Sequence, residues 1–314
     1  MIITLIMPIS AHEYKHHDKW LTPPSDLKHI GNSHGEVALD KSGRIYISVY
    51  EGKHSGVQVY NSEGKYLHNV KNAPTDLHGF LIREEQGKEY IYGAQLYSES
   101  VVKMTIDGEI VLKIEKNKIP TKYHKKKGKR NLTLSSVAVG PEGDIYVVDG
   151  YGLDYIHRFD KTGKYLSTFG GRNDKYKLSN CHKIYIDKRY NPARLLCTNR
   201  NKGTLVHMSL DGEMIGVHAS NLRKPSAVDF YKGQLAVAEI NGRLSILDEN
   251  GKLIKTLSFN DAKYNGNKTK PESWKSGIVT SPHGIAFDKN GNLILTEYSL
   301  YGRVLRFDRS EISK

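Results

Sequence analysis

The chain has 314 residues, 38% of them hydrophobic, which is enough to bury a full core. Lysine and arginine exceed aspartate and glutamate by 13, so anionic partners are favoured over cationic ones. No apolar run is long enough to span a membrane, and two cysteines are too few for a disulfide framework.

The first eleven residues, MIITLIMPISA, are apolar and precede His12 and Glu13. This pattern resembles the end of a secretory signal peptide, although a basic region is missing. It favours a secreted or periplasmic protein over a cytoplasmic one. The alternative is a disordered or strand-forming N-terminus. We assign residues 1–29 to an N-terminal segment and residues 30–314 to one domain.

Six similar strand pairs follow along the chain. They read VALDKSGRIYISV, FLIREEQGKEYIYGA, VAVGPEGDIYVVD, IYIDKRYNPARLLCT, VDFYKGQLAVAE and IAFDKNGNLILTE. The residues that end the first strand of each pair are Asp40, Arg83, Gly140, Asp187, Tyr231 and Asp288. Their separations of 43 to 57 residues match the period of a four-stranded propeller blade. Five copies continue with a third strand and a glycine-containing turn, which is a strong hairpin signal.

The repeats therefore predict an all-β fold, a six-bladed β-propeller. The sixth copy stops after GRVLRFD and lacks an outer strand. We expect a segment within residues 17–30 to supply it, because closing the ring removes open sheet edges. Over roughly residues 30 to 310 the pattern resembles the NHL-repeat family of six-bladed propellers.

Histidine stands at the start of every second blade. The equivalent positions are Gly35, His78, Ser135, His182, Ser226 and His283. Because the first strand of each blade lines the central channel, the three imidazoles are expected to meet on the axis. Three histidines with an open fourth position are typical of catalytic zinc, although another divalent metal is possible. The alternative is that each histidine simply hydrogen-bonds to the neighbouring blade.

Loops after the second strands should lie on the same face as the histidines. They contain Tyr151 in VDGYGLDY and Arg200 in TNRNKG. A tyrosine beside a cation can act as acid or base, and an arginine can bind a carboxylate or oxyanion. The alternatives are turn packing for Tyr151 and a surface salt bridge for Arg200.

Two long connections, around IPTKYHKKKGKRN and FNDAKYNGNKTKPESWKSG, precede blades three and six and should also reach this face. The first would form a basic rim, or else a solvated charge run in a mobile loop. Together the loops provide three expected substrate contacts, namely Glu51, Tyr298 and Lys126.

These residues resemble the family of peptidyl-α-hydroxyglycine α-amidating lyases. The resemblance implies that His78, His182 and His283 bind zinc, that Tyr151 is catalytic and that Arg200 assists it. It also implies a structural calcium ion and a reaction without a redox step, the breakdown of a hydroxyglycine carbinolamide. The chain departs from the family at Gly284, where the family has aspartate, at Ser281, where it has methionine, and in the first-blade loop at Tyr50-Glu51-Gly52, where it has a basic residue.

Three functions remain open at this point. The first is a metal-dependent lyase acting on an anionic small molecule or peptide. The second is a lyase acting on a polysaccharide that contains uronic acid, which the basic loops favour. The third is a non-catalytic propeller that binds RNA or protein on its basic face, although nucleic acid is not the expected partner. We expect a monomer, and we expect Cys181 to point away from the axis by strand alternation.

Overall fold

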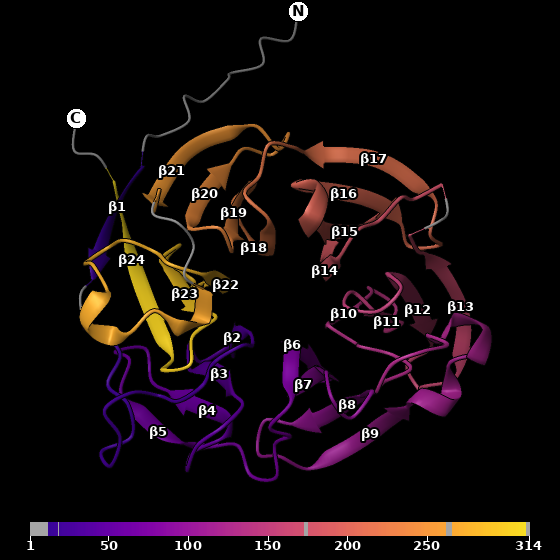
Figure 1. The fold of residues 1–314 in the computed structure, drawn as a ribbon, viewed down its shortest axis with the longest axis horizontal. Helices are drawn as coiled ribbons and strands as arrows, with labels where there is room; N and C mark the ends of the chain where they lie inside the picture. Colours follow the sequence, from indigo (N-terminus) through magenta and orange to yellow (C-terminus); the bar gives the residue numbers. More distant parts are fainter. Residues whose placement is uncertain (1–11, 18, 173–174, 262–265, 312–314) are drawn as a thin grey trace, which may run out of the picture.

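The computed structural model describes residues 12–17, 19–172, 175–261 and 266–311. Within them the chain forms six four-stranded antiparallel sheets arranged around a central axis (Figure 1). The all-β, six-bladed prediction is confirmed. The described residues contain no α-helix, and no helix among them is long and apolar enough to cross a membrane.

The sheets are numbered as blades in chain order. Blade one is β2 (Val37–Leu39), β3 (Ile45–Val49), β4 (Gly56–Tyr60) and β5 (Tyr66–Asn69). Blade two is β6 (Leu77–Glu85), β7 (Lys88–Gln95), β8 (Ser100–Thr105) and β9 (Ile110–Glu115). Blade three is β10 (Ser136–Val139), β11 (Ile145–Val148), β12 (Tyr155–Phe159) and β13 (Tyr165–Gly170).

Blade four is β14 (Cys181–Asp187), β15 (Arg194–Asn199), β16 (Thr204–Ser209) and β17 (Met214–Ala219). Blade five is β18 (Pro225–Tyr231), β19 (Gln234–Glu239), β20 (Arg243–Leu247) and β21 (Leu253–Phe259). Blade six is β22 (Pro282–Phe287), β23 (Leu293–Glu297), β24 (Arg303–Glu311) and β1 (His12–His17). Short 3-10 turns are η1 (Lys116–Lys118), η2 (Thr121–Tyr123), η3 (Arg200–Lys202), η4 (Gly266–Lys268) and η5 (Pro271–Ser273).

The core lies between neighbouring blades. A middle strand such as β3 is buried at every residue, because the neighbouring blades cover both of its faces. Tyr46 of blade one and Phe80 of blade two, for example, belong to one buried cluster. The first strands, β2, β6, β10, β14, β18 and β22, surround the axis (Figure 1). Residues at their starts therefore share one end of the channel.

The ring is closed by an N-terminal strand, but the predicted location was wrong. β1 pairs antiparallel with β24, from His12 opposite Glu311 to His17 opposite Arg306. The period of two explains the choice of segment, since Tyr14 and His16 are half-buried while Glu13 and Lys15 are exposed. Residues 19–30 instead form no strand, and Thr22 makes only an isolated bridge with Lys65, next to β5 of blade one. MIITLIMPISA lies outside the described residues.

Candidate metal and anion site on the propeller axis

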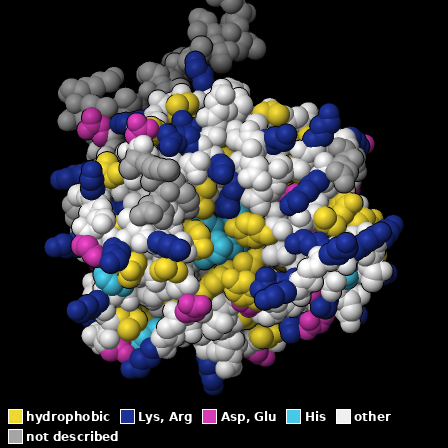
Figure 2. All heavy atoms as spheres, in the orientation of Figure 1, with side chains coloured by type: hydrophobic (Ala, Val, Ile, Leu, Met, Phe, Trp, Pro, Cys, Tyr) yellow, Lys and Arg dark blue, Asp and Glu magenta, His cyan; other side chains and the backbone are white. Residues whose placement is uncertain are grey.

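The starts of β6, β14 and β22 bring three histidines together. The ring centroids of His78 and His182 are 4.9 Å apart, those of His78 and His283 4.9 Å, and those of His182 and His283 4.8 Å. All three side chains are fully buried. Figure 2 shows histidine at the centre of this face, with hydrophobic side chains next to it and lysine and arginine scattered farther out. The predicted convergence on the axis is therefore observed.

The blades without histidine orient these imidazoles. Nδ1 of His78 lies 2.7 Å from the carbonyl oxygen of Ser135, and Nδ1 of His182 lies 2.7 Å from that of Ser226. His283 Nδ1 lies 2.9 Å from the carbonyl oxygen of Gly35. Because a carbonyl can only accept, each Nδ1 carries the proton and each Nε2 keeps a free lone pair. Each imidazole therefore bonds to the next blade through Nδ1 and also converges on the axis. Histidines that bind metals commonly hold a backbone carbonyl with their other ring nitrogen in this way.

A fourth histidine, His34, was missed by the sequence analysis. It comes one residue before Gly35, outside any strand, so no repeat position marks it. Its ring centroid lies 4.9 Å from that of His78 and 4.8 Å from that of His283. It also stacks at 4.0 Å on Tyr298. The signal that could have found it is the glycine after it, which leaves the blade-one position without a side chain.

The donor atoms fit a transition metal. One ligand atom each of His34, His78 and His283 lie within 4.8 Å of one another. Three atoms so spaced lie at most about 2.8 Å from a common point, so each would approach by about 0.7 Å to reach zinc–nitrogen distances. His182 lies outside this close group, and its Nε2 bonds to the Tyr151 hydroxyl instead. His283 Nε2 is buried and has no partner among the described residues. Nitrogen donors suit zinc and its neighbours, whereas calcium and magnesium prefer oxygen, so the axis is not a calcium site.

The histidines are also in the right protonation state. Burial lowers the pKa of His78, His182 and His283 well below the ordinary value, and their positively charged neighbours, including Arg200 and Lys183, act in the same direction. Burial likewise lowers the pKa of His34 to about 3. Neutral imidazole is the form that coordinates a metal.

Tyr151 reaches this cluster from the loop after β11. Its hydroxyl lies 2.9 Å from Nε2 of His182 and 3.3 Å from Nε2 of His78. Burial raises the pKa of Tyr151, while the nearby Arg200 guanidinium opposes that rise. The phenol is therefore protonated at neutral pH and can donate to His182.

The Tyr151 loop is shaped by its neighbours. The Asp149 carboxylate accepts hydrogen bonds from the backbone N–H of Thr133 at 2.5 Å and of Leu153 at 2.8 Å. Asn180 Nδ2 donates to the carbonyl of Gly150 at 2.6 Å. A Cβ at Gly150 would lie 2.1 Å from the carbonyl oxygen of Cys181, so only glycine allows this close approach.

Arg200 carries a buried charge with no acidic partner. Its Nη1 donates to the Tyr151 hydroxyl at 3.3 Å, and its Nη2 donates to Ser226 Oγ at 3.2 Å. Its Nε is buried and has no partner, and no carboxylate pairs with Arg200 in the described part of the chain. A buried unpaired charge is costly. The arrangement is therefore ready to bind an anion.

A buried ion pair, also missed from the sequence, crosses the channel beside the histidines. Lys183 Nζ donates to Glu36 at 2.5 Å and to the carbonyl oxygen of His283 at 3.3 Å. Lys183 follows His182 directly, whereas Gly79 and Gly284 follow the other two histidines. A Cβ at Gly284 would lie 2.6 Å from Glu36 Oε1. The space beside His283 is thus occupied by the Lys183–Glu36 pair.

The three expected substrate contacts lie in different surroundings. Tyr298 packs on His34 within the cluster. Glu51 is exposed, and its carboxylate accepts a hydrogen bond from Asn32 at 3.2 Å. Lys126 is exposed, while its neighbour Lys125 donates to the carbonyl oxygen of Tyr151 at 3.1 Å. The basic connection therefore contacts the site through Lys125.

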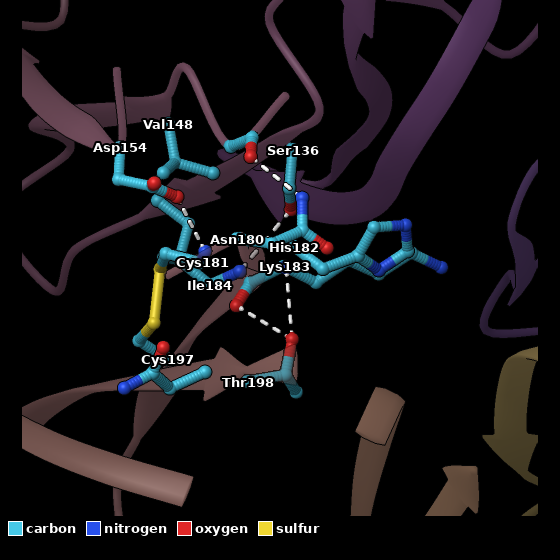
Figure 3. The surroundings of a disulfide bond; sticks show 12 residues. Ser136, Val148, Asp154, Asn180, Cys181, His182, Lys183, Ile184, Cys197 and Thr198 are labelled. Carbon is cyan, nitrogen blue, oxygen red and sulfur yellow. Dashed lines mark hydrogen bonds between the residues drawn. A yellow bond between two sulfur atoms is a disulfide. The ribbon is translucent and has the colours of Figure 1, made fainter. Parts of the chain in front are cut away.

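The two cysteines form a disulfide, Cys181–Cys197, which joins β14 to β15. Figure 3 shows it on the opposite side of β14 from the ring of His182. Both cysteines belong to a buried cluster between blades three and four. The expectation that Cys181 points away from the axis is confirmed.

Known proteins resemble this chain in fold rather than in sequence. No family model and no curated protein matches it. A Bacteroides thetaiotaomicron protein of unknown function superimposes with a TM-score of 0.63 at 12% identity, covering 96% of this chain and 76% of that one. A gluconolactonase from Xanthomonas campestris gives 0.60 at 12% identity, covering 90% and 89%.

A further solved structure, a candidate gluconolactonase, gives a TM-score of 0.62 at 12% identity, covering 92% of this chain and 94% of that one. At such identities these likenesses show the propeller fold alone. They do not single out NHL repeats or amidating lyases, so that part of the resemblance stays a prediction.

Proposed function

We propose that the protein is a metal-dependent lyase that acts on an anionic substrate. In this proposal His78, His182 and His283 hold zinc, Tyr151 transfers a proton and Arg200 binds the negative charge. The observation that carries it is the orientation of the imidazoles, whose Nδ1 atoms bond to neighbouring blades while Nε2 faces the axis. Purely structural histidines would not require an unpartnered Nε2 at His283.

The residues divide the chemistry between them. Zinc bound there would polarise a substrate oxygen and favour ionisation of the nearby phenol. Tyr151 is placed to exchange a proton with the substrate, because its hydroxyl already bridges His182 and Arg200. The guanidinium of Arg200 offers its free Nε–H to a carboxylate or oxyanion.

Two substrate classes fit this division. In an α-hydroxyglycine peptide, the C-terminal carboxylate would bind Arg200 while the carbinolamide breaks. In a uronic-acid polysaccharide, Arg200 and zinc would neutralise the carboxylate while Tyr151 takes the proton from the neighbouring carbon. A C=C bond would form as the glycosidic C–O bond breaks, and the other sugar would leave as an alcohol after protonation. We favour the uronate, because Gly284 stands where amidating lyases have aspartate and the basic connection contacts the site through Lys125. The Cys181–Cys197 disulfide supports a location outside the cytoplasm for either substrate.

A second candidate is lactone hydrolysis. Two of the solved structures with this fold carry the name gluconolactonase, and each aligns over about nine-tenths of this chain. The same zinc, Tyr151 and Arg200 could serve hydrolysis, in which water adds to the lactone carbonyl, the ring C–O bond breaks, and the product carries a carboxylic acid and a hydroxyl. The same histidines on the axis would bind the metal in that reaction.

Metal content tests the proposal first. Purified wild-type protein should carry about one zinc per chain by elemental analysis, and His182→Ala should lose most of it. His68→Ala, on exposed strand β5, serves as the matched control and should keep its zinc. Wild-type protein that takes up no zinc, even after dialysis against the ion, would contradict both the metal-dependent lyase and the metal-dependent hydrolase.

A substrate panel then separates the reactions. Elimination from a uronate creates an unsaturated sugar that absorbs in the ultraviolet, whereas an α-hydroxyglycine peptide releases an amide and glyoxylate. Lactone hydrolysis releases acid and produces neither signal. Ultraviolet absorbance from an acidic polysaccharide is the expected result. Acid release from a lactone alone would favour the hydrolase.

A further inference from the structure

We propose that His34 is a fourth nitrogen ligand of the axial metal and the least firmly held of the four. This inference rests on the metal site of the proposed function. It adds a ligand from blade one to a set that otherwise comes from blades two, four and six.

The position of His34 supports a role as ligand. Its ring lies at contact distance from two of the axial histidines, His78 and His283, and shares with them the group of ligand atoms within 4.8 Å. No hydrogen bond from either ring nitrogen of His34 occurs among the described residues. His34 is half-buried, and a ring nitrogen that bonds to no protein group beside two converging donors is available to the same ion.

The local backbone makes room for this ring. At Gly35 a Cβ would lie 1.5 Å from Ser48 Oγ, so blade one cannot carry a side chain where the other blades carry serine or histidine. The carbonyl of Gly35 instead holds His283, and the preceding residue places its imidazole by the axis. Blade one therefore contributes both an anchor for one ligand and a ligand of its own.

His34 is held less firmly than the others. His78, His182 and His283 are each the second residue of a strand, and each bonds through Nδ1 to the next odd-numbered blade. His34 lies outside any strand and is supported by its stacking on Tyr298 at 4.0 Å. His34 is therefore the ligand that can leave to open a position for substrate.

X-ray absorption spectroscopy on the zinc-loaded wild-type protein measures the number of imidazole ligands directly. Four imidazoles around zinc are the expected result, whereas three imidazoles with oxygen donors would overturn the inference and leave the proposed function intact. If the wild-type protein binds no zinc, the proposed function itself fails, so the two failures are distinguishable.

Variants test the order of affinities. His34→Ala should still bind one zinc per chain but roughly tenfold to a hundredfold more weakly, while His182→Ala should be weaker still. Cobalt-loaded His34→Ala should show a changed visible spectrum, and His68→Ala should match the wild type in both measurements. An unchanged zinc affinity and cobalt spectrum in His34→Ala would refute the assignment. Should that variant fold poorly, the spectroscopy of the wild-type protein decides alone.

Discussion

The hydroxyl of Tyr151, in blade three, lies 2.9 Å from Nε2 of His182, in blade four. This hydrogen bond joins the proposed proton-transfer group to a proposed zinc ligand. It forms because the loop of Asp149 and Gly150 turns the tyrosine toward the axis, while Ser226 fixes the histidine from the other side. Occupancy of the metal site and the position of the phenol should therefore influence each other.

Replacing Tyr151 with phenylalanine should abolish turnover while sparing the metal. The change removes one hydroxyl and keeps the packing of the ring, so the fold should persist. A missing acid or base costs about a hundredfold to ten-thousandfold in rate. Turnover of the responsive substrate would be measured beside zinc content, with Tyr190→Phe, in the connection between β14 and β15, as control. Wild-type rates in Tyr151→Phe would exclude the phenol from the chemistry.

Replacing Arg200 with methionine should mainly weaken substrate binding. The variant keeps much of the side-chain length but loses the unpaired charge, so we expect KM to rise at least about tenfold, equivalent to 1.4 kcal/mol. Arg200→Lys should recover only part of this loss, because an ammonium cannot form the same forked contacts. Steady-state kinetics at several salt concentrations would measure it. An equal KM for a neutral substrate analogue and the anionic substrate would count against an anion-binding role.

Removing one partner of the Lys183–Glu36 pair should destabilise the protein more than removing both. Both side chains are buried, so Lys183→Met leaves a carboxylate without its partner and should cost about 3–5 kcal/mol in the free energy of unfolding. The double variant Lys183→Met with Glu36→Gln should recover much of that loss. Urea denaturation of the wild-type protein, the two single variants and the double variant completes the cycle. Additive losses would show that the two residues are not coupled.

Asp149 should give the stability of the protein a specific pH dependence. Burial raises the pKa of Asp149 to about 6, against the opposing hydrogen bonds of Leu153 and Thr133. The folded state then holds a proton that the unfolded state has lost, so this residue stabilises the fold less as pH rises from about 4 to about 6. Relative to Asp149→Asn, the wild-type protein should lose up to about 3 kcal/mol over that range. Parallel urea curves at pH 4, 5, 6 and 7 measure the difference, and a constant gap would contradict the assignment.

The fold could be predicted because the same strand and turn pattern recurs in each blade. Two buried strands and a tight turn recur with blade spacing, and a histidine at the same strand position on alternate blades must face the same channel. His78, His182 and His283 follow from that symmetry alone. The same reasoning placed Tyr151 and Arg200 on their face, since successive strands of a blade alternate in direction.

Features that break the repeat could not be found in this way. His34 lies outside a strand, and Glu36 meets Lys183 across the channel from 147 positions away in the sequence. No local pattern encodes either contact. The closing strand was misplaced because HEYKHH is polar, and only the alternation of Tyr14 and His16 marks it as an edge strand. Lys125 rather than Lys126 contacts the Tyr151 loop because the backbone N–H of Lys125 is held by the carbonyl of Asn131, a detail of one connection.

The pairing of β1 with β24 determines how the ring responds to force. His12 lies opposite Glu311, so the outer end of each strand leads toward a terminus of the chain and both lie at the same end of the pair. Tension applied between the termini would load the hydrogen bonds one after another, as in unzipping, rather than all at once in shear. The β1–β24 pair should therefore separate at low force, and β1 should detach before the other five sheets unfold.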